Sequence, residues 1–170
     1  MTDTLTIRDA READLARIVA IYNEAIPGRQ ATADTEPVTV ASRAAWFRVH
    51  TALRRPLWVA ERDGGILGWL SFQDFYGRPA YAATAEISLY VSTAAQRAGV
   101  GGRLLARALD RAPALGLATL VGFVFAHNAA SVALFERYGF ARWGHLPRVA
   151  RLDGAERDLL ILGRRVEARA

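Results

Sequence analysis

A glycine-rich turn stands between an apolar segment and an amphipathic one in residues 88–105. Gly99, Gly101 and Gly102 have no Cβ, so a ligand can approach their backbone N–H groups closely. If a strand precedes the turn and a helix follows it, these amides lie at a helix N-terminus, where unpaired donors and the helix dipole favour an anion. The spacing from Gln96 is neither the dinucleotide-binding G-x-G-x-x-G nor a P-loop, which needs Gly-Lys-Ser/Thr. We interpret the turn as a cradle for a pyrophosphate.

Other reactive residue types are scarce. The chain has no cysteine, which excludes disulfides, zinc–thiolate sites and a thiol nucleophile. His50, His127 and His145 have spacings that match no common ligand pattern, so we expect no metal. No serine–histidine pairing stands out, which argues against a covalent acyl-enzyme.

Composition limits the class of protein. The 170 residues, 52% hydrophobic and 23% charged, fit one globular domain over 1–170. We expect a cytoplasmic protein with no membrane partner, because the N-terminus lacks a signal-peptide apolar run and no segment reaches the roughly 18 apolar residues of a membrane helix. The net charge is +5, yet every basic residue is arginine and the arginines are scattered among acids. We therefore expect no nucleic-acid partner, and the excess charge can draw in a polyanionic cofactor.

The elements that must position the cradle alternate between strand and helix. The turn Asp63-Gly64-Gly65 predicts a hairpin, Gly139 is typical of a helix C-terminus, and no linker or repeat interrupts the chain. Trp46, Phe47 and Leu53 form the expected apolar side of the second helix, and we interpret all four tryptophans, which include Trp58, Trp69 and Trp143, as packing residues. Predicted strands cover 5–8, 57–61, 66–73, 85–92, 119–125, 140–150 and 158–162; predicted helices cover 11–25, 40–53, 101 to about 113–116, and 128–138.

The motifs and their order resemble the GNAT acyl-CoA N-acyltransferases. The cradle spacing precedes Asn128-Ala-Ala-Ser131, and Glu136-Arg-Tyr-Gly-Phe140 follows. Five further motifs resemble the phosphinothricin and methionine sulfoximine N-acetyltransferase branch, over nearly the whole chain. These are Ile21-Tyr-Asn23, Ala33-Asp-Thr-Glu-Pro37, Phe75-Tyr-Gly-Arg-Pro-Ala-Tyr81, Glu86-Ile-Ser-Leu-Tyr-Val91 and His127-Asn-Ala-Ala-Ser131.

This resemblance implies an α/β (α+β) GNAT fold. That fold is a single mixed, mostly antiparallel sheet of about seven strands, with flanking helices and a splayed central strand pair. The resemblance also implies acetyl-CoA as cosubstrate, with its pantetheine arm along the backbone of one splayed strand, its pyrophosphate on the cradle amides, and an asparagine contacting the arm. The cofactor-binding residues so implied are Leu89, Tyr90, Val91, Gln96, Arg97, Ala98, Gly99, Val100, Gly101, Gly102, Asn128 and Ser131.

Acetyl transfer to an amine needs a group that takes the ammonium proton, and a carboxylate with a pKa raised by burial is suited to this. Glu86 matches the position of the family's catalytic glutamate; a solvated glutamate at a strand end is the alternative. The resemblance makes the Val91 N–H the oxyanion donor. Phe135 stands where many members have Tyr or His and cannot donate a proton, while Tyr138 is interpreted as a packing residue. The general acid stays unassigned.

Arg78 resembles the residue with which this branch holds the acidic group of the acceptor, since a guanidinium binds a carboxylate or phosphinate in bidentate fashion. A surface arginine beside a proline turn is the alternative. Tyr76 and Gly77 form the same wall in this interpretation, and Tyr22, Asn23 and residues 32–35 complete the pocket. Ala33 and Glu156 replace a Phe and a Trp that are frequent in the family, which changes the acceptor side.

The leading hypothesis is an N-acetyltransferase that acts on the α-amine of a small amino-acid-like acceptor, of the phosphinothricin, methionine sulfoximine or methionine sulfone type, in a direct ternary complex. Acetylation of a protein N-terminus or a polyamine is the competing activity. A non-catalytic acyl-CoA-binding module is the competing class. The resemblance also allows a homodimer.

Overall fold

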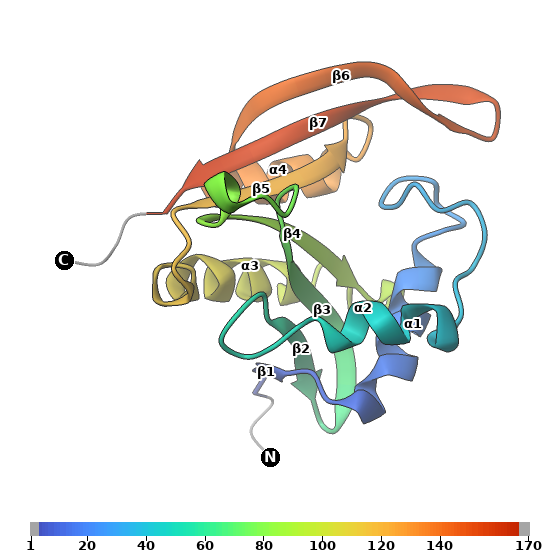
Figure 1. Cartoon of the computed structure of the whole chain (residues 1–170). Coiled ribbons are helices and arrows are strands. Elements are labelled where there is room, and N and C mark those ends of the chain that lie inside the picture. Colours follow the sequence, from blue (N-terminus) through green and yellow to red (C-terminus); the bar gives the residue numbers. More distant parts are fainter. Residues whose placement is uncertain (1–3, 167–170) are drawn as a thin grey trace.

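The computed structural model describes residues 4–166, which form one open seven-stranded sheet in the order β1-β2-β3-β4-β5-β7-β6 (Figure 1). All neighbouring strands are antiparallel except β4 and β5, which are parallel. The predicted mixed, mostly antiparallel fold is therefore confirmed. The strands are β1 (Thr6–Asp9), β2 (Leu57–Arg62), β3 (Gly65–Asp74), β4 (Thr84–Val91), β5 (Thr119–Phe125), β6 (Ala141–Leu152) and β7 (Ala155–Arg165). The helices are α1 (Leu15–Glu24), α2 (Val40–Arg48), α3 (Val100–Arg111) and α4 (Ala129–Arg137).

The two faces of the sheet carry two separate apolar cores. On one face, Leu70 and Ile87 pack in a cluster with Leu104 of α3 and Val132 of α4. On the other face, Trp69 packs with residues of α1 such as Ile18, and α2 borders this second cluster. Because successive strand residues point to opposite faces, β3 and β4 supply one set of side chains to α3 and the alternate set to α1 and α2. The central strands thus separate two apolar cores, one under α3 and α4 and one under α1 and α2.

The parallel joint in the middle of the sheet is short. Strands β4 and β5 share only three ladder pairs, at Thr84, Ala85 and Glu86 of β4. Strand β4 continues to Val91 and β5 to Phe125 without further pairing to each other, so the two strands diverge after Glu86. This is the predicted splay.

Turn chemistry explains the local geometry near these strands. Asp63 and Gly64 have φ values of 50° and 75°, as a two-residue turn of type I′ requires, and they join β2 to β3. Asn128 caps the N-terminus of α4 by accepting a hydrogen bond from the Ser131 amide at 3.2 Å. Gly139, with φ of 80°, follows the C-terminus of α4 as predicted.

Three details differ from the prediction. Helix α2 ends at Arg48, and Leu53, expected on its apolar side, is 88% exposed. The last two strands are longer than predicted and form a projecting arm, the β6–β7 hairpin at the top of Figure 1. Trp143 lies on the outer strand β6 and is 50% exposed, yet its ring covers Gly163 of β7, where a Cβ would overlap it; it is therefore a packing residue at the surface rather than in the core.

Candidate active site

Glu86 lies at the point where the sheet opens. Its ladder partners are Gln73 on β3 and Val121 on β5, and the β4–β5 ladder ends with that second pair. The side chain is half-buried, and burial raises the pKa of the Glu86 carboxyl above its usual value. Within residues 4–166 no group donates a hydrogen bond to this carboxylate that would offset the effect. A half-buried carboxyl with a raised pKa is suited to accept a proton near neutral pH.

The side chains of β4 alternate between the two faces. Leu89 and Val91 point toward α3, since a Cβ placed on Gly101 would lie 3.6 Å from each of them. Tyr90 points to the opposite face, where its ring meets Tyr22 of α1 edge-on at 4.9 Å. Glu86 and Ser88 share that face with Tyr90 by alternation.

The backbone of the diverging part of β4 is oriented toward the gap. The Ser92 amide, just after β4, donates to the Leu67 carbonyl of β3 at 2.8 Å, and N–H groups alternate in direction along a strand. The N–H groups of Leu89 and Val91 therefore point to the β5 side, where the ladder has ended. These are two of the residues predicted to meet the cofactor arm.

The predicted cradle follows β4 directly. A short turn leads to Gly99, whose φ of 77° places it in the left-handed region, and α3 begins at Val100. Hydrogen bonding in α3 starts with the Arg103 amide, which donates to the Gly99 carbonyl at 3.1 Å. The amides of Val100, Gly101 and Gly102 therefore precede the helical ladder, at the positive end of the helix dipole.

The glycines of α3 also have a packing role. A Cβ on Gly101 would lie 3.2 Å from Leu134 of α4, and one on Gly102 would lie 2.7 Å from the hydroxyl oxygen of Tyr138. Close approach of α3 to α4 thus requires small residues here, independently of any ligand. Phe135 is buried and its ring lies against Gly122 of β5, so the site offers no hydroxyl at this position.

A cavity of about 140 Å³ lies beside β4, on the face that carries Glu86. Its walls come from α1, the loop after it, α2, β3 and β4; they include Tyr22, Arg43, Ser71, Gln73, Ser88 and Tyr90. Of the residues predicted to complete the acceptor pocket, Tyr22 lines this cavity. Asn23 instead holds the loop, through two hydrogen bonds of 2.9 Å with the backbone of Val38.

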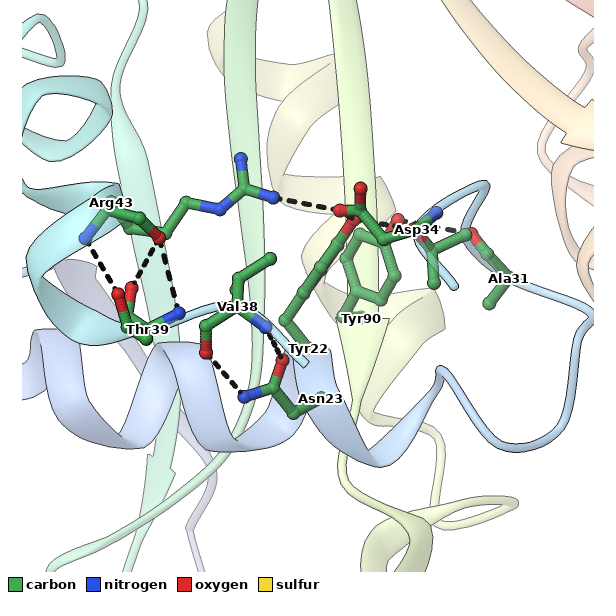
Figure 2. Close-up of polar contacts among 10 residues, drawn as sticks. Tyr22, Asn23, Ala31, Asp34, Val38, Thr39, Arg43 and Tyr90 are labelled. Carbon is green, nitrogen blue, oxygen red and sulfur yellow. Dashed lines mark hydrogen bonds and ion pairs between the residues drawn. The ribbon is translucent and has the colours of Figure 1, made fainter. Parts of the chain in front are cut away.

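A polar network closes one end of the cavity (Figure 2). Arg43 donates to the Asp34 carboxylate at 3.0 Å, and its guanidinium lies 5.0 Å from the centre of the Tyr22 ring. Tyr22 also donates its hydroxyl proton to Asp34, and Tyr90 donates to the carbonyl of Ala31 at 3.1 Å. Sequence reasoning missed Arg43.

The loop between α1 and α2 crosses to the opposite side of the splay. The Nδ2 group of Asn128 donates to the Gln30 carbonyl at 3.2 Å, and His127 Nε2 lies 2.7 Å from the Arg29 carbonyl oxygen. Arg29 pairs with Asp153 at the tip of the β6–β7 arm at 3.0 Å. Asn128, predicted to contact the cofactor, therefore caps α4 and holds this loop in the structure.

The predicted acceptor wall lies elsewhere. Tyr76 is 76% exposed, and its ring packs against Phe75 and Tyr81 rather than on the cavity. Arg78 is exposed too and does not line the cavity. The loop of Tyr76, Gly77 and Arg78 follows β3, beyond Gln73, and so lies toward the Glu86 end of the two strands.

Two kinds of feature are absent from the described part of the chain, residues 4–166. It holds no group of three or more His, Cys, Asp or Glu side chains placed to bind a metal. None of its helices is long and apolar enough to cross a membrane.

The short parallel joint thus ends at a half-buried carboxyl, and a glycine turn at a helix N-terminus follows the same strand. The model of the Acetyltransferase (GNAT) family matches residues 17–140, and the chain therefore belongs to the GNAT family. The predicted family and the predicted enzyme class, an acetyl-CoA-dependent acetyltransferase, are confirmed.

Individual relatives agree with this. The chain is 52% identical over 161 residues to a Bacillus subtilis protein named "Putative phosphinothricin acetyltransferase YwnH", covering 94% of this chain and 98% of the relative. It is 37% identical to an L-methionine sulfoximine/L-methionine sulfone acetyltransferase of Pseudomonas aeruginosa, covering 92% of both. A phosphinothricin acetyltransferase from Sinorhizobium meliloti, solved in complex with acetyl-CoA, superposes with a TM-score of 0.90 at 30% identity, covering 96% of this chain and 89% of that one.

Proposed function

We propose that this protein transfers the acetyl group of acetyl-CoA to the α-amine of a small amino-acid-like acceptor, by direct attack in a ternary complex. The observation that carries the proposal is Glu86, a half-buried carboxyl at the end of the β4–β5 ladder, on the same face as a cavity. The relatives named for phosphinothricin and methionine sulfoximine support an acceptor of that size and type. The whole chain, 1–170, acts as one domain in this proposal.

Acetyl-CoA lies on the α3 side of the splay. The amides of Gln96, Arg97, Ala98 and Gly99–Gly102 surround the pyrophosphate, where the dipole of α3 stabilises its charge. Those of Gln96 and Ala98 must first release the carbonyls of Thr93 and Ala95, to which they donate at 3.5 and 3.4 Å. The backbone of Leu89, Tyr90 and Val91 follows the pantetheine arm, and Asn128 and Ser131 approach it from α4. Asn128 can do so only through atoms that its present hydrogen bonds leave available, or by releasing the Gln30 carbonyl.

The transfer needs two groups from the chain. Glu86 takes the proton of the acceptor's ammonium group through a chain of water molecules, because five residues of β4, about 16 Å at roughly 3.3 Å per residue, separate it from Val91. The free amine attacks the thioester carbonyl. Its oxygen becomes negative, and the Val91 N–H, which points into the gap, donates a hydrogen bond to it. The C–S bond then breaks, and the nitrogen of the new amide releases its second proton to solvent. The thiolate takes a proton from solvent, because Phe135 offers none.

Arg78, with Tyr76 and Gly77, forms an outer wall of the acceptor site in this proposal. These residues are exposed and extend from the Glu86 end of the strands, where a side-chain acid of the acceptor can meet them. A cytoplasmic location, and the absence of nucleic-acid and membrane partners, stay predictions.

Release of free CoA with a panel of amines tests the activity. We expect turnover with phosphinothricin, methionine sulfoximine or methionine sulfone, and less with a polyamine or a peptide N-terminus. A reversed order would identify the competing activity. A non-catalytic module would bind CoA in calorimetry and release thiol with no acceptor.

A Gly101 variant tests the cofactor site, provided that packing is controlled. Gly101→Val alone crowds Leu134, so its effect mixes stability with binding. Pairing it with Leu134→Ala makes room in α4. Loss of CoA binding in a folded double variant supports the cradle, while unchanged CoA affinity contradicts it.

We also propose that two copies associate through the β6–β7 arm. Strand β6 is the outer edge of the sheet and exposes Trp143, Leu146 and Val149, three apolar side chains that a second copy can cover. Sedimentation velocity of the wild type and of Trp143→Arg tests this. A wild-type monomer at micromolar concentration rejects it.

A further inference from the structure

We propose that Arg43 binds the α-carboxylate of the acceptor and so determines that amino acids are preferred to simple amines. This inference rests on the proposed function, which assigns the acceptor to the cavity beside β4. Arg43 lines that cavity from α2.

The cavity has the properties of a ligand site. A cavity of about 150 Å³ takes a molecule the size of benzene, and the volume here is about 140 Å³. It is therefore of the right size for the side chain of a small amino acid. Trp46 and Trp69 supply apolar walls, while Ser71, Gln73 and Ser88 supply polar groups from the sheet. An apolar pocket with a few convergent polar groups is the usual form of a small-molecule site.

Ser71 gives independent evidence for a ligand. Its side chain is fully buried, it lines the cavity, and its hydroxyl has no hydrogen-bond partner among the residues that the structure describes. Buried polar groups are nearly always paired, because an unpaired one loses its hydration without compensation. Ser71 stands opposite Ser88 in the β3–β4 ladder. The Ser71 hydroxyl can therefore form a hydrogen bond with a polar atom at the far end of an acceptor side chain.

Arg43 is held in place before any ligand binds. Asp34 accepts one of its hydrogen bonds at 3.0 Å, and the Tyr22 ring lies against its guanidinium plane at 5.0 Å from centre to carbon (Figure 2). A guanidinium has five N–H donors, and in residues 4–166 Asp34 accepts from only one of them. The remaining donors can bind a second carboxylate in the planar, bidentate geometry that arginine favours.

The place of Arg43 relative to β4 indicates that it binds the α-carboxylate of the acceptor rather than an acid group at the end of the acceptor side chain. Arg43 contacts Tyr22, whose ring meets Tyr90, and Tyr90 precedes the proposed oxyanion donor Val91. The attacking amine must lie beside that donor. In an amino acid, the carboxylate bonded to the same carbon as the amine is the nearest acid group, and Arg43 is the cation in the cavity wall that would bind it. The acceptor side chain then extends toward Ser71 and Gln73.

A pair of acceptors that differ only in this acid tests the inference: L-methionine sulfone and its carboxamide. We expect Arg43→Gln to raise KM for the acid about 10- to 100-fold, because charge-assisted hydrogen bonds to its carboxylate are lost. KM for the carboxamide should change about twofold at most. kcat and the KM for acetyl-CoA should stay near wild type. Arg48→Gln, an exposed change on the same helix, is the matched control and should alter neither acceptor's KM.

The outcomes separate this inference from the proposed function. An equal loss for acid and carboxamide in Arg43→Gln, or an acid-specific loss in Arg78→Gln in its place, overturns the role of Arg43 while the activity stands. If the wild type releases no thiol, calorimetry of L-methionine sulfone with the CoA-bound protein tests the role of Arg43 without catalysis. The inference is supported if Arg43→Gln weakens this binding and Arg48→Gln does not. No binding to the wild type overturns it.

Discussion

Glu86 and Val121 form the last ladder pair between β4 and β5. The residue that carries the proposed base is thus also the residue at which the sheet opens. The strand therefore fixes the Cα of Glu86 both at the start of the gap and relative to the backbone groups that follow it on β4.

Glu86→Gln removes the proton acceptor and keeps the shape of the side chain. We expect kcat to fall about 10²- to 10⁴-fold, the usual contribution of a positioned general base. The affinity for acetyl-CoA, measured by calorimetry, should not change, because the cradle lies beyond the end of β4. A variant with wild-type turnover would show that Glu86 is a structural residue.

The raised pKa of Glu86 also predicts an effect on stability. A carboxyl whose pKa is higher in the folded state favours folding below its unfolded pKa, and that contribution is lost as the pH rises through the folded pKa. At pH 8 Glu86→Gln should therefore be more stable than the wild type, and the difference should shrink as the pH falls toward 4. Thermal unfolding at both pH values measures it. In activity, the wild-type kcat/KM should rise with pH through a pKa above that of an ordinary glutamate.

Gly102 and Tyr138 should be coupled in stability. Gly102→Ala places a methyl 2.7 Å from the Tyr138 hydroxyl, and such overpacking costs about 1–3 kcal/mol. Tyr138→Phe removes the clashing oxygen, so the double variant should recover most of the free energy of unfolding in urea titrations. Tyr138→Phe alone should keep its thiol-release rate, since solvent protonates the leaving group. A large fall in kcat would instead make Tyr138 the missing general acid.

Asn128 has two tasks that two substitutions can separate. Asn128→Asp keeps the oxygen that caps α4 but loses the donor to the Gln30 carbonyl, whereas Asn128→Ala loses both. Loss of the cap costs about 1 kcal/mol, so Asn128→Ala should be the less stable variant. If holding the loop orders the acceptor side, both variants should raise the acceptor KM alike. Equal stability of the two would contradict the capping role.

Short sequence motifs predicted much of the fold correctly. The turn at Asp63 and Gly64, the helix stop at Gly139 and the glycines at the start of α3 each depend on nearby residues only, and all three lie where the sequence predicted them. The predicted end of the second helix, Leu53, lies beyond the observed end of α2 at Arg48. The apolar pattern of α2 is weak, and none of its residues is buried. Trp143 packs on Gly163 but stays half exposed, because an edge strand leaves one side of its apolar residues uncovered.

The sequence indicated the candidate site along β4, in the turn after it and at Tyr22 of α1, which lines the cavity. Ser71 and Gln73 offered a signal, since they are polar residues at alternate positions of an otherwise apolar strand. Arg43 offered none, because 22 arginines are scattered along the chain and only the packing of α2 against the sheet brings this one to the cavity. The motif around Arg78 indicated a residue of the acceptor site, yet the loop after β3 places its side chain in solvent.

The opposite orientation of neighbouring β4 side chains has a consequence for inhibitors. Leu89 and Val91 face α3, while Ser88 and Tyr90 face the cavity, so the two substrates of the proposed reaction approach from opposite sides of one strand. Neither needs to pass the other, and binding can proceed in random order. A bisubstrate compound that links CoA to an amino acid must pass through the gap between β4 and β5. We expect that its linker can be no larger than the acetyl group it replaces.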